Sequence, residues 1–151
     1  MPVFCDDMLA VDPATGRVDL AFDGTNLVMD TTAQTAMILA VGCDRRARAD
    51  DKVADVGNAY APSTLVARRG TPLDALDTLG RLFGSRMWLL ARRKQTEATR
   101  RFAESALQEC AAPIAAMGVP VTIKVRWVRY QVLGWQMAAG PVQLSHNLAV
   151  G

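Results

Sequence analysis

The chain has 151 residues, half of them hydrophobic and 21% charged, which is the composition of one globular domain with a sizeable core. Its net charge of +2 comes from 17 basic and 15 acidic residues, so it lacks the strong basic excess typical of nucleic-acid binding. Three dispersed cysteines and a single histidine argue against a disulfide framework and against a metal site. We therefore expect free thiols, no metal and no cofactor.

The N-terminus lacks a basic region followed by an apolar run, and the longest apolar run, Ala36–Val41, is too short to span a bilayer. We therefore expect no membrane association and a chain made and kept in a cytoplasm. Residues 1–16 form a mixed lead-in that we interpret as an arm, either loose or ordered on a partner. Residues 17–151 are expected to form a single domain.

The first regular element predicted is a β-hairpin over residues 18–29. Val18, Leu20 and Phe22 alternate with polar residues, and residues 27–29 supply a second short strand. Between them, Asp23-Gly24 tolerates the positive φ that tight hairpin turns need.

Three to four helices are predicted next. Residues 33–41 are apolar and follow the capping residues Asp30-Thr31-Thr32, which favours a helix, although a buried strand remains possible. A long irregular segment, residues 53–70, leads to a helix that begins at Pro72. The break at Gly84-Ser85 then starts a short core helix capped by Ser85.

The longest helix is predicted to begin at Thr96. Its apolar stripe steps by four residues along Phe102, Ala106, Cys110 and Ile114. Cys110 on this stripe is expected to be a buried thiol, and Pro113 to kink the last turn.

The last third of the chain changes to an alternating pattern. Residues 121–128 place apolar side chains on one face and Lys124 and Arg126 on the other, and two further strands follow at 132–137 and 142–148. This pattern predicts an antiparallel meander that lays its apolar face on the helices. The expected fold class is therefore α+β, with an N-terminal hairpin, helices and a C-terminal meander in one layer-packed domain.

No catalytic centre is apparent. The lone His146 lies in an alternating strand and is interpreted as a surface residue. Glu97, Glu104 and Glu109 share a helix with arginines, so a solvated helix face explains them. We expect no small-molecule substrate and no enzymatic activity.

Two polar clusters allow more than one interpretation. Asp44, Arg45 and Arg46 follow an apolar helix, so they are either a solvated helix exit or a cluster that holds a loop or meets a neighbouring subunit. Arg86 and Trp88 lie either in a short core helix with a charged exit or at an interface, where these residue types are enriched.

The second cluster carries a resemblance to a known family. The run Gly84-Ser85-Arg86-Met87-Trp88-Leu89-Leu90, the upstream Asp44-Arg45-Arg46-Ala47, and the helix-then-meander C-terminus resemble the phage Mu-type baseplate protein family of contractile tails. The resemblance covers residues 17–148. Two regions depart from it: residues 53–70 lack the family's tryptophan- and glycine-rich character, and the first fifteen residues match nothing in the family.

This resemblance implies a structural role in the baseplate wedge, related to the small wedge protein of T-even phages that carries a lysozyme-like name. Family members are expected in six copies, or a multiple, around the hub in the virion tail, after assembly in the host cytoplasm. They bind other wedge proteins, the tail sheath protein and possible hub or tube proteins. They also present the surface on which the first sheath ring assembles.

The implied mechanism is β-augmentation, in which a partner strand pairs with an open edge. The candidate edges are the hairpin at 18–29 and the last strand, represented by Leu144. Arg86 is expected to be a structural arginine bonded to loop carbonyls or to Asp44, with Trp88 packed beside it.

Two other classes of function stay open. One is a lysozyme-like enzyme acting on peptidoglycan, and the other is a nucleic-acid-binding module. The latter would use five basic residues: Arg92, Arg93, Lys94, Arg100 and Arg101. A further open question is whether Cys5 crosslinks to a neighbour in the particle.

Overall fold

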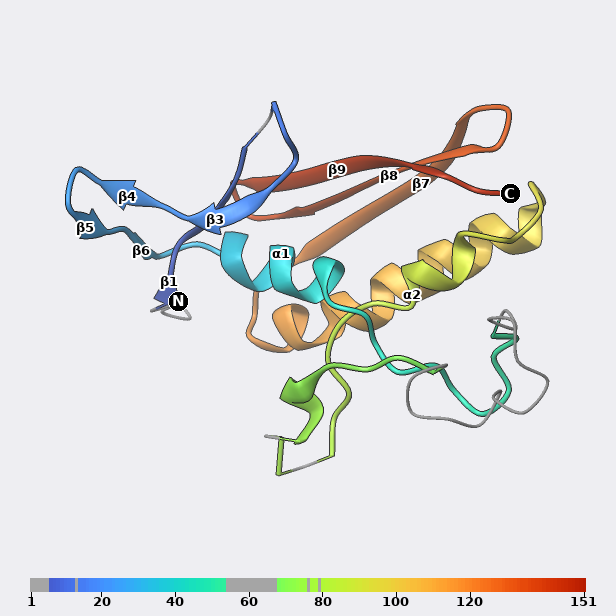
Figure 1. The fold of residues 1–151 in the computed structure, drawn as a ribbon, viewed down its shortest axis with the longest axis horizontal. Coiled ribbons are helices and arrows are strands. Elements are labelled where there is room, and N and C mark those ends of the chain that lie inside the picture. The colour runs from blue at the N-terminus through green and yellow to red at the C-terminus, as the bar shows by residue number, and fades with distance from the viewer. Residues whose placement is uncertain (1–5, 13, 54–67, 76, 79) are drawn as a thin grey trace.

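A three-stranded antiparallel sheet forms the centre of the protein. The computed structural model describes residues 6–12, 14–53, 68–75, 77–78 and 80–151. In the sheet, β7 (Val121–Arg129), β8 (Val132–Ala139) and β9 (Val142–Ala149) follow one another as a meander. Two α-helices, α1 (Gln34–Gly42) and α2 (Glu97–Ala116), lie on one face of it (Figure 1). The fold class is α+β, and the C-terminal meander is confirmed.

The sheet and the helices share one apolar core. The inner face of β8 contributes Leu133 and Met137, which are fully buried, and Met37 and Leu107 from the two helices are equally inaccessible. On β7 the burial alternates, as a strand with one face on the core requires. Within the described residues, no helix is long and apolar enough to cross a membrane.

Helix α1 begins as the capping residues predict, although by a less direct route. Asp30 is only 1% exposed, and its carboxylate accepts hydrogen bonds from the backbone N–H groups of Thr32 and Thr35, both at 2.7 Å. Burial opposes ionisation of Asp30, but the hydrogen bonds from Thr32 and Thr35 outweigh it and lower its pKa. Asp30 thus satisfies the N–H of Thr35, and the hydroxyl of Thr32 accepts from the N–H of Gln34 at 3.1 Å. Residues 34–42 form a helix rather than the alternative buried strand.

Helix α2 confirms the capped apolar stripe. The hydroxyl oxygen of Thr96 accepts a hydrogen bond from the N–H of Thr99 at 3.1 Å. Cys110 is buried, and desolvation raises the pKa of its thiol to about 12, as expected for a thiol that acts as a small hydrophobe. The helix continues past Pro113 to Ala116.

The N-terminal region differs from the predicted hairpin. Only its tip exists, where β4 (Phe22–Asp23) pairs with β5 (Asn26–Leu27). The flanking strands pair with the lead-in instead: β3 (Val18–Leu20) with β2 (Leu9–Val11), and β6 (Met29–Asp30) with β1 (Asp6–Asp7). We call residues 6–30 the N-terminal ribbons.

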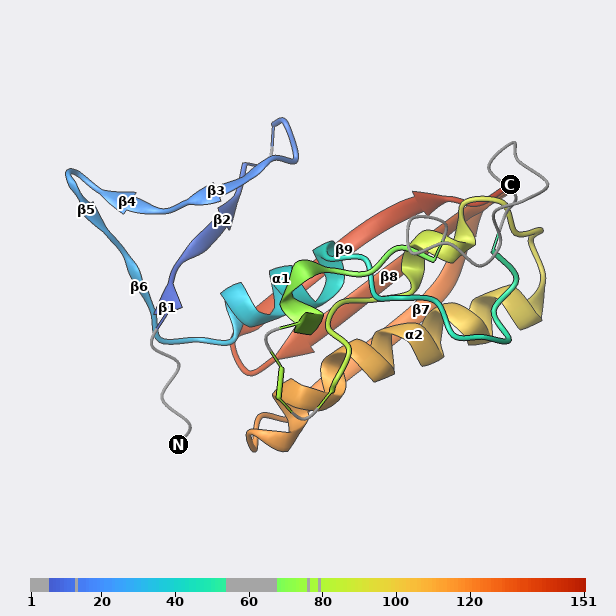
Figure 2. The same cartoon turned by 60° about the horizontal axis from the view of Figure 1, so that its bottom comes forward.

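A ring of backbone hydrogen bonds joins the three ribbons. Met8 donates to Val28, Val28 to Ala21, and Ala21 to Met8, at 2.8–3.0 Å. The ribbons diverge from this ring and extend away from the core (Figure 2). Consequently the expectation of one layer-packed domain is wrong, because these strands form small sheets of their own.

The helix count was also overestimated. Two of the predicted helices are only short 3-10 turns in the structure, η1 (Pro72–Ala75) and η2 (Met87–Leu90). Asp74 explains the first difference, because its carboxylate accepts a hydrogen bond from the N–H of Phe83 at 2.7 Å and folds the chain back. Ser85 is not a cap either, since its hydroxyl donates to the carbonyl of Val41 at 3.0 Å.

The first turn of α1 holds the ribbons in place. The hydroxyl of Thr35 accepts from the N–H of Leu9 at 3.0 Å and donates to the carbonyl of Asp7 at 3.1 Å. The side-chain amide of Gln34 donates to the carbonyl of Leu9 at 2.7 Å. These side chains connect two segments that lie about 26 residues apart in sequence.

This contact predicts the effect of Thr35→Val, which keeps the shape of the side chain but removes its hydrogen bonds. We expect a local loss of about 1.4 kcal/mol, so the amide of Leu9 should exchange with solvent about tenfold faster while β7–β9 stay protected. Hydrogen exchange followed by NMR measures this. The exposed Thr31→Val is the control, and unchanged exchange at Leu9 in Thr35→Val contradicts the anchoring role.

Candidate functional site

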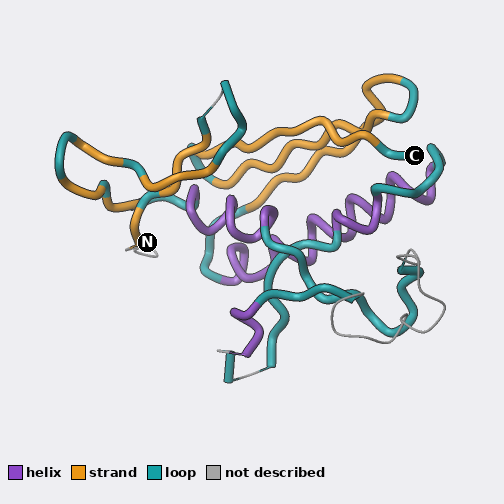
Figure 3. The backbone as a smooth tube through the Cα atoms, in the orientation of Figure 1, coloured by secondary structure: helices purple, strands orange, loops and turns teal. Residues whose placement is uncertain are grey.

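The two sequence landmarks contact each other on the side of the helices away from the sheet (Figure 3). The N–H of Ser85 donates to the carbonyl of Cys43, and the N–H of Arg45 donates to the carbonyl of Ser85, both at 2.9 Å. Asp44 and Ser85 therefore form a parallel β-bridge.

Gly84 makes this contact possible. Its φ is +91°, and a Cβ there would lie 2.4 Å from the carbonyl oxygen of Cys43 and 2.9 Å from the nitrogen of Arg45. No side chain fits at that distance, so the motif requires glycine at this position.

Arg86 is buried between two carboxylates. The residue is 4% exposed, and its Nη1 donates to both carboxylate oxygens of Asp51 at 3.0 Å. Its Nε donates to Glu109 on α2 at 2.8 Å. The guanidinium thus connects the loop after Asp44, the Gly84 motif and the long helix.

Two further arginines reach the same glutamate. Arg48 contacts Glu109 at 2.8 Å and Arg45 contacts it at 3.4 Å. We call Arg45, Arg48, Asp51, Arg86 and Glu109 the arginine–carboxylate cluster.

The cluster keeps its members charged. Burial opposes ionisation of Glu109, but hydrogen bonds from Arg48 and Arg86 outweigh it and lower the pKa of this carboxyl. Burial likewise opposes the charge on Arg86, while its hydrogen bonds to Asp51 and Glu109 raise its pKa. Both groups are therefore ionised at neutral pH.

Trp88 closes the outer side of the motif. Its Nε1 donates to the carbonyl of Arg45 at 2.9 Å. The guanidinium of Arg69 lies 4.5 Å from the ring centroid, and Arg69 also pairs with Asp44 at 2.5 Å. Asp44 and Trp88 are thus linked through Arg69, a residue that the sequence did not single out.

The structure brings together most of the predicted site residues, but their hydrogen-bond and ion-pair partners differ from those predicted. The expected partners of Arg86, loop carbonyls or Asp44, are wrong. Instead it is Arg45 that donates to a loop carbonyl, that of Leu82 at 2.5 Å. Arg46 is half-exposed and lies beside Gly70, and among the described residues it has no hydrogen bond or ion pair.

Leu144 is not part of the cluster and lies on the edge strand β9, where it packs partly against the core. The N–H of Val150 donates to Gln131 beyond the end of β8 at 2.8 Å, and the β8–β9 register is regular. Because N–H directions alternate along an antiparallel strand, the N–H of Leu144 also faces β8. The N–H groups of Gln143, Ser145 and Asn147 face the open edge.

Asp51 and Glu109 are the carboxylates of the cluster that sequence reasoning missed. Glu109 was placed on a solvated helix face because arginines share its helix, and this interpretation is wrong. Its position next to Cys110, which lies on the buried stripe, could have indicated that Glu109 is partly buried. No sequence pattern pointed to Asp51. It reaches Arg86 because the bridge between Asp44 and Ser85 directs the loop that carries it.

The cluster does not suit acid–base chemistry, although it brings two carboxylates close to one guanidinium. A general acid must carry a proton near neutral pH, and the lowered pKa of Glu109 opposes that. The arrangement instead suits a rigid internal connection.

Most of the chain is similar to known phage proteins. The family model described as phage protein GP46 matches residues 33–144. The chain is also 33% identical, over 117 residues, to the baseplate protein gp46 of Escherichia phage Mu, and the alignment covers 74% of each protein. No solved structure matches the chain. The family match includes the cluster, β7, β8 and the first three residues of β9, and it begins after the N-terminal ribbons.

Arg86→Ala tests the cluster. It leaves Asp51 and Glu109 without their shared guanidinium, so we expect the free energy of unfolding to fall by about 3–5 kcal/mol. Arg86→Lys should recover only part of this, because an ammonium cannot reproduce the planar fork. Urea unfolding measures both. Arg92→Ala, at an exposed position, should change stability by less than about 0.5 kcal/mol. Equal stability of Arg86→Ala and wild type would remove the structural role.

Glu109→Gln tests the electrostatics. Because the pKa of Glu109 is lowered in the folded state, its ionised form stabilises the fold above the ordinary carboxyl pKa of 4.5, and this contribution is lost as pH falls through the lowered value. We expect Glu109→Gln to cost about 2 kcal/mol at pH 7 and progressively less under acid conditions. Urea unfolding across pH, with the more exposed Glu104→Gln as control, measures the difference. A cost independent of pH contradicts the charge-based account.

Proposed function

Because the chain belongs to the phage protein GP46 family of Mu-type baseplate proteins, we propose that it is a structural wedge component of a contractile phage tail. In this proposal it links other wedge proteins around the hub and provides the platform for the first ring of tail sheath. It resides in the tail baseplate of the virion, in six copies or a multiple, after assembly in the host cytoplasm. The baseplate name of the Mu relative supports the general role.

An open strand edge supports the proposed assembly role. Strand β9 pairs with β8 on one side only, and no other described strand pairs with its second edge. The opposite edge of the sheet is less free, because Arg100 donates to the carbonyl of Val125 on β7 at 3.4 Å. The β9 edge, which includes Leu144, is therefore the better candidate for pairing with a strand of the sheath protein.

The N-terminal ribbons offer a second contact region. Phe22 is 61% exposed, and the same ribbons expose five further large apolar residues: Val11, Val18, Leu20, Leu27 and Met29. Two-stranded ribbons of this length are marginal in isolation, and exposed apolar strands favour association. We infer that a neighbouring wedge, hub or tube protein covers them in the baseplate.

The division into an arm of residues 1–16 and a wedge domain of residues 17–151 remains a prediction. Strands β1 and β2 in the lead-in pair with strands of residues 18–30, so the arm and the first part of the domain act together. Crosslinking of Cys5 concerns a residue outside the described ones.

The competing functions receive less support. An acid catalyst for peptidoglycan hydrolysis is disfavoured because arginines hold Glu109 ionised. For nucleic acid, three of the five candidate basic residues are already engaged: Arg100 and Arg101 pair with Glu97, and Arg93 stacks on Phe102. The proposal therefore assigns the protein no catalytic activity.

Co-expression with the sheath protein and the neighbouring wedge proteins of the same genome tests the proposal. We expect a stable complex on affinity purification that seeds sheath polymers visible by electron microscopy. A well-folded sample that binds none of these tail proteins contradicts it.

Proline substitution tests the edge. Ser145→Pro removes an N–H that faces the open edge, so it should abolish sheath seeding while leaving the fold intact. Leu144→Pro removes an N–H that faces β8 and should destabilise the sheet itself, by roughly 3 kcal/mol. Circular dichroism and the seeding assay separate the two effects. Normal seeding by folded Ser145→Pro excludes the β9 edge.

A further inference from the structure

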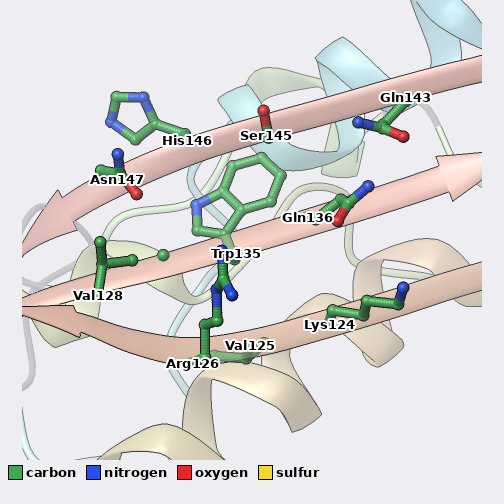
Figure 4. Close-up of a pocket in the computed structure, with 11 residues that line it drawn as sticks. Lys124, Val125, Arg126, Val128, Trp135, Gln136, Gln143, Ser145, His146 and Asn147 are labelled. Atoms are coloured by element: carbon green, nitrogen blue, oxygen red, sulfur yellow. The ribbon is translucent and has the colours of Figure 1, made fainter.

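The face of the β7–β8–β9 sheet opposite the helices carries a shallow polar hollow of about 490 Å³ (Figure 4). Cross-strand register places its side chains in two rows on this face. One row is Lys124, Gln136 and Ser145, and the other is Arg126, Gly134 and Asn147. Gly134 has no side chain, and its neighbours close over it, since a Cβ there would lie 2.4 Å from Cγ2 of Val128 and 2.9 Å from Oδ1 of Asn147.

The charges in this hollow are of one sign. Among the described residues, Lys124 and Arg126 line it and no carboxylate does. Both residues are exposed, and within the described part of the chain neither has an ion pair. Arg86 and Arg100, by contrast, each contact two carboxylates. The two cations of the sheet face are therefore available to an external partner.

The spacing of the cations favours an extended ligand. Side chains two residues apart on a strand project from the same face about 7 Å apart. A partner segment in extended conformation repeats its own side chains at the same interval, so carboxylates at alternate positions match Lys124 and Arg126. The neighbouring amides of Gln136 and Asn147 both donate and accept hydrogen bonds, which suits a peptide backbone.

A nucleic acid fits this face less well. Binding of single strands combines a track of cations with exposed aromatic rings for base stacking. Of the described residues that line the hollow, two are cations, and the lining residue Trp135 also packs partly against the core.

We propose that this sheet face docks an acidic segment of a partner baseplate protein, with Lys124 and Arg126 binding its carboxylates. The identity of the partner class rests on the proposed function. The chemistry of the segment rests on the charge and spacing of the sheet face.

The double variant Lys124→Glu/Arg126→Glu tests the surface in the co-expressed complex. It should weaken the complex about tenfold or more, because two attractions become repulsions. Arg92→Glu/Lys94→Glu is the matched control, with the same charge change and the same two-residue spacing away from this face, and should weaken it less than about twofold. Circular dichroism checks that both variants fold.

A zero-length carbodiimide crosslinker supplies the second readout. It joins a lysine amine to a carboxylate in direct contact, so mass spectrometry should find Lys124 linked to an aspartate or glutamate of the partner. Changing that partner residue to lysine should restore binding to the Lys124→Glu/Arg126→Glu variant.

Each outcome decides between the proposals. A complex that forms normally with Lys124→Glu/Arg126→Glu overturns the acidic docking surface and leaves the baseplate role intact. Failure of the wild-type chain to bind any tail protein overturns both. Binding of a labelled single-stranded oligonucleotide that the same variant abolishes assigns the face to nucleic acid and overturns the acidic-segment proposal.

Discussion

The buried guanidinium of Arg86 is the constraint on which much of this structure depends. A charge that is 96% removed from solvent is tolerated only when opposite charges and hydrogen bonds surround it. Asp51 and Glu109 supply both, and they come from a loop and a helix that are far apart in sequence. Satisfying Arg86 therefore fixes how the irregular segments after α1 and before α2 lie on the helices.

Several neighbouring features follow from that position. Gly84 must adopt a positive φ to let the chain pass close to Cys43, and Trp88 then reaches the carbonyl of Arg45. The segments after α1 and before α2 have little regular secondary structure. Hydrogen bonds and ion pairs of side chains hold them in place instead of backbone hydrogen bonds between strands. The arginine–carboxylate cluster has the composition of an active site, but its bonds hold these irregular segments onto helix α2.

Three outer surfaces are candidates for contact with partner proteins. The open edge of β9, the apolar N-terminal ribbons and the cationic sheet face offer different chemistry. One offers backbone hydrogen bonds, one offers apolar area and one offers charge. A component that meets several neighbours in an assembly needs such separate surfaces, and a rigid interior keeps them in fixed relation.

The sequence predicts the periodic elements well and the irregular ones poorly. Helix α2 and the meander have long, unambiguous patterns, and capping chemistry decided in favour of helix α1 over a strand. The prediction of a helix beginning at Pro72 is wrong because the carboxylate of Asp74 accepts a hydrogen bond from the N–H of Phe83. The spacing of apolar residues does not reveal this contact. The partners of Arg86 were equally hidden, since a long side chain can reach carboxylates that no sequence motif connects.

Electron cryo-microscopy of the assembled tail tests the central claim most directly. We expect this chain in the baseplate, with the arginine–carboxylate cluster intact inside it and a neighbouring protein in contact with the β9 edge, the ribbons or the cationic face. A particle that lacks the chain, or one in which all three surfaces remain exposed to solvent, would contradict the account.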